Sequence, residues 1–318
     1  MQNYIAEPGQ VKEKLDEYGI AIVKNVLNVA EIQSMKDGSW DYLEHITQNF
    51  ETPINRNDDA TWKEFLHLYP KHSMLLQQWG IGHAKYIWDI RQNVNVVDVF
   101  AKIWDCEQED LLTSFDGASC HFPPEKTGRG WYRGNLWLHT DQSYTRNEFE
   151  CTQSWITAYD VKAGDATLAF MEGSHKYHKD FAADHNITDK SDWYKLNNEQ
   201  IQYYKEKGCL CKRVLCNAGD MVLWDSRTIH CGIEPMKKRK ELNFRNVAYI
   251  CMMPRNTATP AMIRKKQKAF NEKRTTNHWA NRPKIFPVTP RTYGGNIPDV
   301  VDVPDVELTE LGRRLAGF

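Results

Sequence analysis

The first third of the chain carries hydrophobic residues at helical spacing. Residues 11–18 show this spacing, Gly19 is expected to end the helix, and residues 20–24 form an apolar run that predicts a strand. Asn28 is a predicted N-cap for a second helix that runs to about residue 46. Residues 73–105 carry two more helix-like segments. The pattern therefore predicts a helical N-terminal part over residues 10–110.

From residue 111 the pattern changes to short β-rich runs separated by Gly, Pro and charged turns. Runs of this kind favour a sandwich or jelly roll. Residues 180–208 are polar and aromatic and predict a helical insertion between core strands. With no internal repeat and no convincing linker, we expect a single domain over residues 1–318, with a mainly β core at 111–253 and a C-terminal wrap at 254–318.

The C-terminal wrap begins with a basic, amphipathic segment at residues 261–274 and continues through an irregular, aromatic segment to residue 295. Because such a segment cannot form a core of its own, we expect it to dock over the mouth of the β core and to shape substrate choice. Arg264, Lys268 and Arg274 are candidates to meet an anionic substrate. His278 is interpreted as a packing histidine rather than a metal ligand.

Composition limits the possible partners and the cellular compartment of the protein. The net charge of −1 gives no whole-protein argument for nucleic acid or for an anionic membrane. No apolar run is long enough to span a bilayer, and the first residues lack the pattern of a signal peptide. The eight cysteines are scattered without Cys-x-x-Cys pairs, which gives no support to a structural zinc site. Several lie in apolar strands, where a free Cys acts as a small hydrophobe, and this favours a reducing compartment and predicts a cytoplasmic protein.

His139 and Asp141 are the first two candidate metal ligands. They lie two apart in the strand-like run at residues 131–141, so their side chains point to the same face. A second His-x-Asp pair, His178 and Asp180, lies in a polar stretch without alternation. We interpret that second pair as a solvated loop or helix start.

Two residues further along the chain complete the candidate site. His230 follows a Gly-Asp turn and an apolar strand, and two His with one carboxylate are the facial ligand set of non-haem Fe(II) oxygenases. Arg245 opens another apolar strand, where a buried guanidinium needs an anionic partner such as a 2-oxo acid. Arg239 is a rival for this role, but its lysine-rich run is interpreted as a solvated loop.

In this order the segments resemble the phytanoyl-CoA dioxygenase-like family of Fe(II)/2-oxoglutarate-dependent oxygenases. The shared features are the His-x-Asp pair, a Gly-Ser-His-Lys turn at 173–176, the Gly-Asp strand that ends in His, and the Arg on the next strand. The resemblance covers about residues 10–253. The turn at residues 234–240 is longer than is common in the family.

The resemblance implies a double-stranded β-helix (a cupin-like jelly roll), with the N-terminal helices packed on one sheet. It also implies that His139, Asp141 and His230 bind Fe(II), that Arg245 binds 2-oxoglutarate and that Trp155 packs beside this co-substrate.

The implied reaction consumes O2 and 2-oxoglutarate, releases succinate and CO2, and hydroxylates an unactivated C–H bond of a small-molecule substrate. Halogenating relatives lack the carboxylate ligand, so the presence of Asp141 favours hydroxylation. The substrate itself is not encoded in a readable motif. The candidates to face it are Arg133, Asn135, Gln142 and Tyr144, and the candidates to shield the site are Trp137, Trp155 and Trp224.

Two other functions remain open at this point. A cupin-like metal-binding protein could use a similar ligand set without 2-oxoglutarate. A nucleic-acid demethylase of the wider superfamily is the other, but its only support is the basic segment at 261–274, and we expect neither nucleic acid nor membrane as a partner. The pattern leaves the oligomeric state open.

Overall fold

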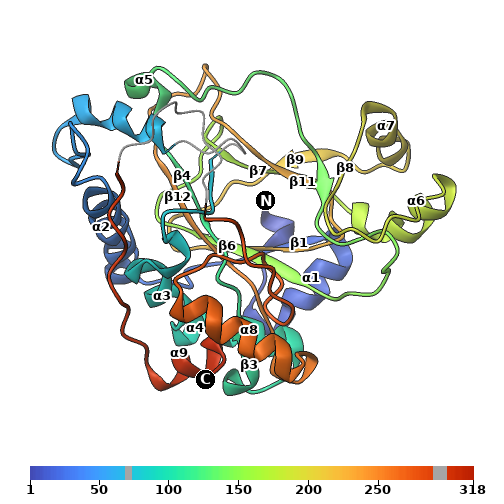
Figure 1. Ribbon diagram of the computed structural model, residues 1–318. Coiled ribbons are helices and arrows are strands. Elements are labelled where there is room, and N and C mark those ends of the chain that lie inside the picture. Colours follow the sequence, from blue (N-terminus) through green and yellow to red (C-terminus); the bar gives the residue numbers. More distant parts are fainter. Residues whose placement is uncertain (69–73, 289–298) are drawn as a thin grey trace.

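The computed structural model describes residues 1–68, 74–288 and 299–318, in which helices surround antiparallel sheets (Figure 1). The two larger sheets have six and five strands, and a separate pair of strands joins the C-terminal part of the core to its start. All the ladders between these strands are antiparallel.

Each of the larger sheets brings together strands that lie far apart in the sequence. Across the six-stranded sheet the order is β1 (Ile20–Val23), β10 (Met221–Asp225), β6 (Thr152–Thr157), β12 (Arg245–Ile250), β4 (Ala118–His121) and β2 (Leu75–Leu76). Across the five-stranded sheet it is β8 (Tyr194–Lys195), β5 (His139–Thr140), β11 (His230–Ile233), β7 (Thr167–Met171) and β9 (Cys211–Arg213). The third sheet pairs β13 (Met252–Pro254) with β3 (Leu111–Thr113).

The helices lie mostly at the two ends of the described sequence and in one insertion. The α-helices are α1 (Val11–Tyr18), α2 (Val29–Ile46), α3 (Lys85–Arg91), α4 (Val94–Trp104), α5 (Pro124–Thr127), α6 (His178–Asp184), α7 (Asn198–Glu206), α8 (Pro260–Asn271) and α9 (Glu310–Ala316). Short 3-10 turns are η1 (Gln2–Tyr4), η2 (Pro8–Gln10), η3 (Asp59–His67), η4 (Ile81–His83), η5 (Gln108–Asp110), η6 (Ser174–Tyr177) and η7 (Arg255–Thr257).

Local sequence signals explain where the first helices begin and end. Gly19 ends α1 in the left-handed conformation, at φ +78°, and its amide donates to the Leu15 carbonyl. Asn28 caps α2 through its side chain, which accepts from the Glu31 amide, while the Glu31 carboxylate accepts from the Asn28 amide. Both helix boundaries predicted from the sequence are confirmed.

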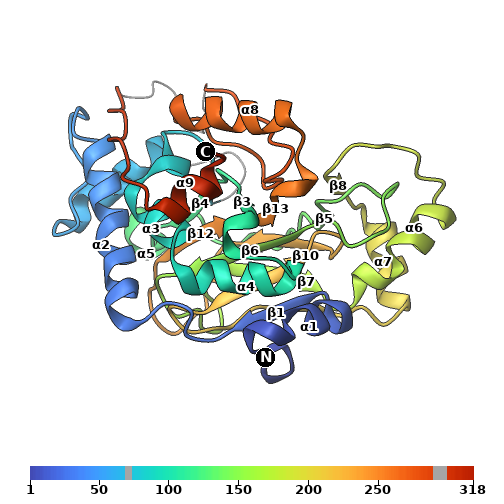
Figure 2. The same cartoon turned by 90° about the horizontal axis from the view of Figure 1, so that it is seen from below.

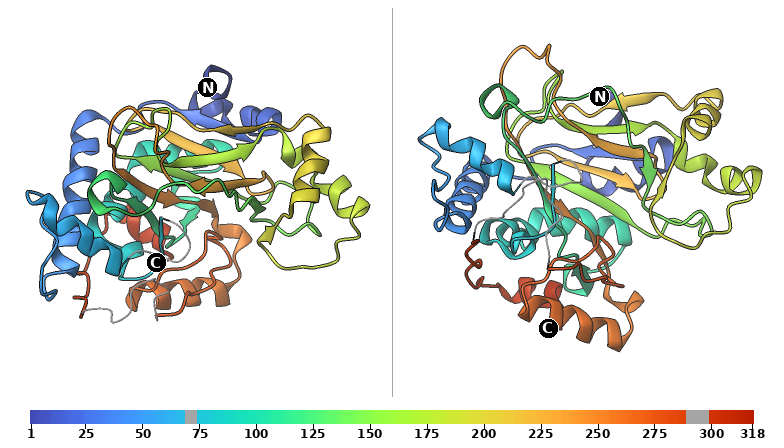
Figure 3. Two further views of the ribbon diagram at one scale, coloured as in Figure 1. Left: turned by 90° about the horizontal axis from the view of Figure 1, so that it is seen from above. Right: turned by 45° about the horizontal axis from the view of Figure 1, so that its top comes forward.

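Buried side chains divide the molecule into layers. The outer face of the six-stranded sheet, with Ile156 and Leu223, packs against N-terminal helices through residues such as Leu43 and Phe100. Figures 2 and 3 show α2, α3 and α4 on this side of the sheets. Burying a large apolar side chain contributes about 1.5–3 kcal/mol, so this contact fixes the helices on the sheet.

The opposite face of the six-stranded sheet turns toward the five-stranded sheet. Trp155 and Val247 from the first sheet share a buried cluster with Leu168 and Phe170 from the second. The outer face of the five-stranded sheet is covered in turn by the insertion, because Phe181 of α6 and other buried residues of the insertion pack against it. The two sheets therefore face each other, with a helical layer outside each.

The structure changes one expectation, adds one helix and leaves one predicted segment outside the described residues. The strand-like run at 131–141 forms a strand only at His139–Thr140, although Trp137 and His139 do share a face. Helix α9, capped by Thr309, was not predicted. The end of the predicted wrap, residues 289–295, lies outside the described residues. None of the described helices is both long enough and apolar enough to cross a membrane.

Candidate metal centre

His139, Asp141 and His230 converge although 91 positions separate the first from the last in sequence. Strand β11 pairs with β5 so that His230 stands directly opposite His139, and Asp141 follows β5 on the same face. One ligand atom from each residue lies within 4.8 Å of the others. The Nε2 atoms of His139 and His230 are 3.5 Å and 3.2 Å from the two Asp141 oxygens.

Backbone carbonyls orient both imidazoles. The Nδ1 atom of His139 lies 3.2 Å from the Trp137 carbonyl oxygen, and Nδ1 of His230 lies 2.9 Å from the Thr228 carbonyl oxygen. A carbonyl can only accept, so Nδ1 carries a proton in each ring, which leaves Nε2 as the atom that can bind a metal ion. This is the tautomer that a metal ion requires.

Burial and charge prepare the three groups for a cation. Burial lowers the pKa of His139 to about 4, so its imidazole is neutral near pH 7. Burial alone would raise the pKa of Asp141, but the His139 and His230 rings outweigh it and hold that pKa well below its usual range. The carboxylate also accepts a 2.7 Å hydrogen bond from Gln153 Nε2. Two imidazoles and one carboxylate therefore meet, a donor set that fits Fe(II).

Two of the three tryptophans expected to shield the site lie against its histidines. The Trp137 ring stacks on His139 with centroids 4.6 Å apart, and the Trp224 ring lies 5.3 Å from His230. Trp155 instead lies in the buried cluster between the sheets and beside Arg245. The indoles limit water access to the histidines, which strengthens electrostatic interactions there.

Arg245 enters the space between the sheets from the first residue of β12. Its Nε donates to Ser119 Oγ at 2.9 Å, Nη1 donates to the Ala166 carbonyl at 3.4 Å, and the guanidinium lies 5.3 Å from the Trp155 ring centre. Only 5% of Arg245 is exposed, and no carboxylate of the described residues pairs with it. A buried cation in this state is a strong candidate to bind an anion.

Arg239 is already engaged, which removes it as a rival for this role. It pairs with Glu125 of α5 at 2.5 Å and with Asp165 at 3.3 Å, and its side chain is only 2% exposed. The interpretation of Arg239 as part of a solvated loop is therefore wrong. The enlarged turn folds back onto the protein because two carboxylates receive this guanidinium.

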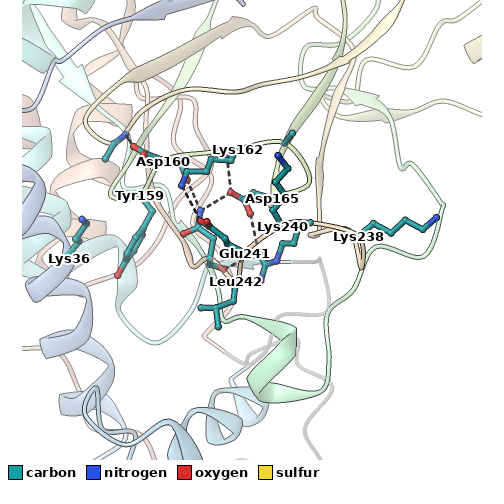
Figure 4. A pocket seen from close by; sticks show the side chains of 13 residues that line it. Lys36, Tyr159, Asp160, Lys162, Asp165, Lys238, Lys240, Glu241 and Leu242 are labelled. Carbon is teal, nitrogen blue, oxygen red and sulfur yellow. Dashed lines mark hydrogen bonds and ion pairs between the residues drawn. The ribbon is translucent and has the colours of Figure 1, made fainter.

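The enlarged turn also forms one wall of a cavity of about 670 Å³ (Figure 4). The cavity contains several lysines, but their charges do not converge. Lys162 pairs with Glu241 at 3.4 Å, and Lys36 lies over the Tyr159 ring at 5.0 Å. Figure 4 shows Lys238 pointing away from the others. The cavity is separate from the three candidate ligands.

The second His-x-Asp pair does not form a metal site. His178 is the first residue of α6, is buried, and has Nε2 3.1 Å from the Ser143 carbonyl oxygen, whereas Asp180 is exposed. The prediction of a helix start is confirmed, but His178 is a core residue rather than a solvated one. Among the described residues, the one cluster with metal-ligand geometry is that of His139, Asp141 and His230.

The four residues expected to face the substrate do not do so as a group. Gln142 is buried and donates to the Arg146 and Glu148 carbonyls, and the Tyr144 hydroxyl is 3.0 Å from that of Tyr204. Arg133 and Asn135 are exposed. The expectation is wrong for Gln142 and Tyr144, because the chain leaves the β5 direction after Asp141.

Sequence reasoning missed the residues that support the site. Gln153 holds Asp141, Ser119 holds Arg245, and Thr228 supplies the carbonyl that orients His230. Gln153 had a readable signal, since it lies two residues before Trp155 and so shares its face of a predicted strand. The other two become visible only through pairing between distant strands.

The C-terminal segment divides into two parts. Helix α8 packs near α9, with Ala269 and Phe270 in a cluster with Trp88 and Phe115. Of its three candidate cations, Lys268 pairs with Glu272 and Arg274 donates to the Phe286 carbonyl, while Arg264 is exposed.

The residues after α8 pack against the segment that precedes β6, where Arg282 pairs with Glu150 at 2.8 Å and Arg146 lies 5.2 Å from the Trp279 ring centre. Burial lowers the pKa of His278, and the charge of the Asp141 carboxylate partly opposes this shift. The ligand atoms that converge do not include those of His278.

We expect Gly19→Ala to weaken both the fold and metal binding. The Thr228 hydroxyl donates to the Gly19 carbonyl at 2.9 Å, and the Thr228 carbonyl orients His230. A Cβ on Gly19, at φ +78°, would lie 2.4 Å from Thr228 Oγ1. The strain should reduce the free energy of unfolding by about 1–3 kcal/mol, and Fe(II) affinity should fall by about tenfold.

Denaturant unfolding and Fe(II) titration measure the two effects. Gly9→Ala is the matched control, because a Cβ at Gly9 meets nothing within 4 Å. Unchanged Fe(II) affinity in a destabilised Gly19→Ala protein would show that this contact does not support His230.

Comparison with known proteins identifies a matching family and related proteins. The model of the family described as phytanoyl-CoA dioxygenase (PhyH) matches residues 15–233, more than half of the chain. The match includes the three candidate ligands and ends before Arg245. "Ava biosynthesis cluster protein O" of Aspergillus versicolor is 26% identical over 282 residues, which are 86% of this chain and 87% of that protein.

Solved structures share the fold at low identity. Hypothetical protein JW0805 of Escherichia coli has a TM-score of 0.63 at 15% identity, with 99% of this chain and 85% of that chain covered. A protein of Salmonella typhimurium LT2 also has a TM-score of 0.63, at 13% identity and with 99% and 86% coverage. These two likenesses concern the fold alone. The family match over residues 15–233, by contrast, shows that this chain belongs to the phytanoyl-CoA dioxygenase family.

Proposed function

We propose that the protein is an Fe(II)- and 2-oxoglutarate-dependent dioxygenase that hydroxylates an unactivated C–H bond of a small-molecule substrate. The observation that carries the proposal is the convergence of His139, Asp141 and His230 within 4.8 Å, with both imidazoles presenting Nε2. We also propose that the two facing sheets form a double-stranded β-helix, which is the jelly-roll framework expected from the resemblance.

The donor set supports Fe(II) as the metal. Two neutral imidazoles and a carboxylate on one side of an ion leave its other positions for exchangeable ligands. Asp141 supplies the negative charge and Gln153 fixes its orientation through the 2.7 Å hydrogen bond. Because three side chains fill one face, the co-substrate and O2 would approach from the other.

The space around Arg245 supports 2-oxoglutarate as the co-substrate. Among the described residues, the buried guanidinium has no acidic partner, and the neighbouring Trp155 Nε1 is a buried donor without an acceptor. A carboxylate bound there would satisfy both groups, with Ser119 holding the guanidinium in place. Bound Fe(II) and 2-oxoglutarate together supply the activation of O2, with release of succinate and CO2.

The other residues of the site position and protect this chemistry. Trp137 and Trp224 cover the two histidines, so less water reaches the reacting atoms. Thr228 and Trp137 hold the imidazoles through backbone carbonyls, which need no rearrangement during a reaction. We propose a cytoplasmic enzyme that uses O2 and a small molecule as its partners.

The test is turnover of the purified chain with Fe(II), 2-oxoglutarate and O2. We expect succinate to form in step with CO2, and a metabolite screen to reveal a product heavier by one oxygen atom. The protein loaded with Zn(II) is the control and should give no succinate. Tight Fe(II) binding without succinate formation and without 2-oxoglutarate binding would instead support a cupin-like metal-binding protein.

A further inference from the structure

Trp193 is a large aromatic side chain that stands half-exposed beside the candidate metal centre. Its ring centre lies 5.7 Å from that of His139, with the planes at 37°, and 50% of the residue is exposed. Its φ of +74° is a conformation that residues with side chains rarely adopt. An indole this exposed has apolar surface that a flat ligand can cover.

The backbone on both sides of Trp193 is anchored. In the pairing of β8 with β5, Tyr194 stands opposite Thr140, so Trp193 comes beside the next residue, Asp141. On the other side, the Asp192 carboxylate accepts from the Ser143 amide at 3.2 Å and from the Arg146 guanidinium at 2.5 Å. The indole is therefore held at a defined place next to the ligands rather than carried on a free loop.

His278 approaches the same space from the C-terminal segment. Its Nε2 atom is buried and has no hydrogen-bond partner, a state that costs free energy unless a ligand satisfies it. The Arg146 guanidinium, which pairs with Asp192 at 2.5 Å, lies 5.2 Å from the ring centre of Trp279, the residue after His278. Because Asp192 directly precedes Trp193, the two segments that carry Trp193 and His278 meet at Arg146.

The charged groups around this region pair with one another. Arg146 pairs with Glu150 at 2.9 Å and with Asp192, and Arg282 pairs with the same Glu150 at 2.8 Å. Arg282 also lies 3.7 Å from the ring centre of Trp279, which follows His278. These four charges are already paired, which leaves the Trp193 indole face and the His278 imidazole nitrogen among the groups available to a substrate.

We propose that Trp193 and His278 form the substrate subsite, and that it takes a flat, ring-containing molecule. The ring would stack on Trp193 and a polar substituent would hydrogen-bond to His278 Nε2. The proposal rests on the proposed function, because the subsite is useful only beside a reactive metal centre. It assigns substrate choice to two segments outside the paired core strands, the insertion before α7 and the chain after α8.

The test uses matched probes on the full chain loaded with Zn(II) and 2-oxoglutarate, in which no turnover occurs. The probes are 2-naphthol, naphthalene and decahydro-2-naphthol, which differ in the hydroxyl or in the flatness of the same ring skeleton. Ligand-observed NMR gives their dissociation constants. We expect 2-naphthol to bind about tenfold more tightly than its saturated analogue, as ring stacking on an aromatic side chain implies.

Two variants separate the two contacts. Trp193→Ala should weaken 2-naphthol and naphthalene alike by about tenfold, and Trp193→Phe should restore most of the binding because it keeps a ring face. His278→Ala should weaken 2-naphthol toward the level of naphthalene and leave naphthalene unchanged. Leu210→Ala, a change at a 62% exposed apolar residue near the end of the insertion, is the control and should alter nothing.

The proposal is overturned if the wild-type protein binds none of the probes, or if Trp193→Ala binds them as tightly as wild type. A separate measurement reports on the proposed function. The visible charge-transfer absorption of the protein with Fe(II) and 2-oxoglutarate under nitrogen should be the same in wild type and in all four variants. If wild type lacks this absorption but the probes still bind as expected, the proposed function fails and the ring subsite stands.

Discussion

Replacing His139 or Asp141 with alanine is expected to abolish 2-oxoglutarate turnover and to reduce Fe(II) affinity by at least a hundredfold. Loss of a residue that merely orients a metal ligand costs about 10–100-fold in affinity, and these two residues supply ligand atoms themselves. In the Asp141 variant the site would also lose its only carboxylate ligand, and two neutral imidazoles hold a divalent cation less well. Isothermal titration with Fe(II) under nitrogen and succinate release measure the two effects.

The matched control is Asp180→Ala, which removes the carboxylate of the second His-x-Asp pair. Asp180 is exposed in the first turn of α6 and lies outside the converging ligand atoms, so iron binding and turnover should remain as in wild type. The reverse result, with iron lost in Asp180→Ala and retained in Asp141→Ala, would move the metal site to the other pair.

The same two pairs show what local sequence can and cannot predict. His139 and Asp141 share a face because strand side chains alternate, and this needs no knowledge of the rest of the fold. Their meeting with His230 depends on the pairing of β11 with β5, which no local pattern encodes. The expected order of segments in a known family supplied that long-range information, and the geometry agrees with it.

Other features depended on contacts that sequence patterns do not contain. Arg239 looked like part of a lysine-rich surface loop, yet it is buried because Glu125, 114 positions earlier, and Asp165 receive its guanidinium. The run before His139 alternates like a strand, but only His139 and Thr140 belong to one, and Gly134 turns the chain at φ +90°. Trp193 gave no signal at all, since its position follows from the pairing of β8 at a sheet edge.

Arg245→Ala is expected to raise the KM for 2-oxoglutarate by tenfold or more and to leave Fe(II) affinity nearly unchanged. Removing one partner of a buried, hydrogen-bonded ion pair costs about 2–5 kcal/mol, and tenfold corresponds to about 1.4 kcal/mol, so the bound is conservative. Arg245→Lys should lie between wild type and alanine, because an ammonium keeps the charge but lacks the planar fork that binds a carboxylate through two hydrogen bonds. Initial rates over a series of 2-oxoglutarate concentrations measure the KM.

Arg239→Ala distinguishes this role from a general need for a buried arginine. The Arg239 side chain is also buried, at 2% exposed, but it is paired with Glu125 and Asp165. Its loss should therefore leave two carboxylates without their cation. We therefore expect Arg239→Ala to lower the melting temperature while the KM for 2-oxoglutarate in the folded fraction stays within about twofold of wild type. A large rise in KM in Arg239→Ala, with Arg245→Ala unaffected, would mean that the co-substrate lies in the cavity beside the enlarged turn. The space between the sheets would then need another ligand to explain why Arg245 is buried there without an acidic partner.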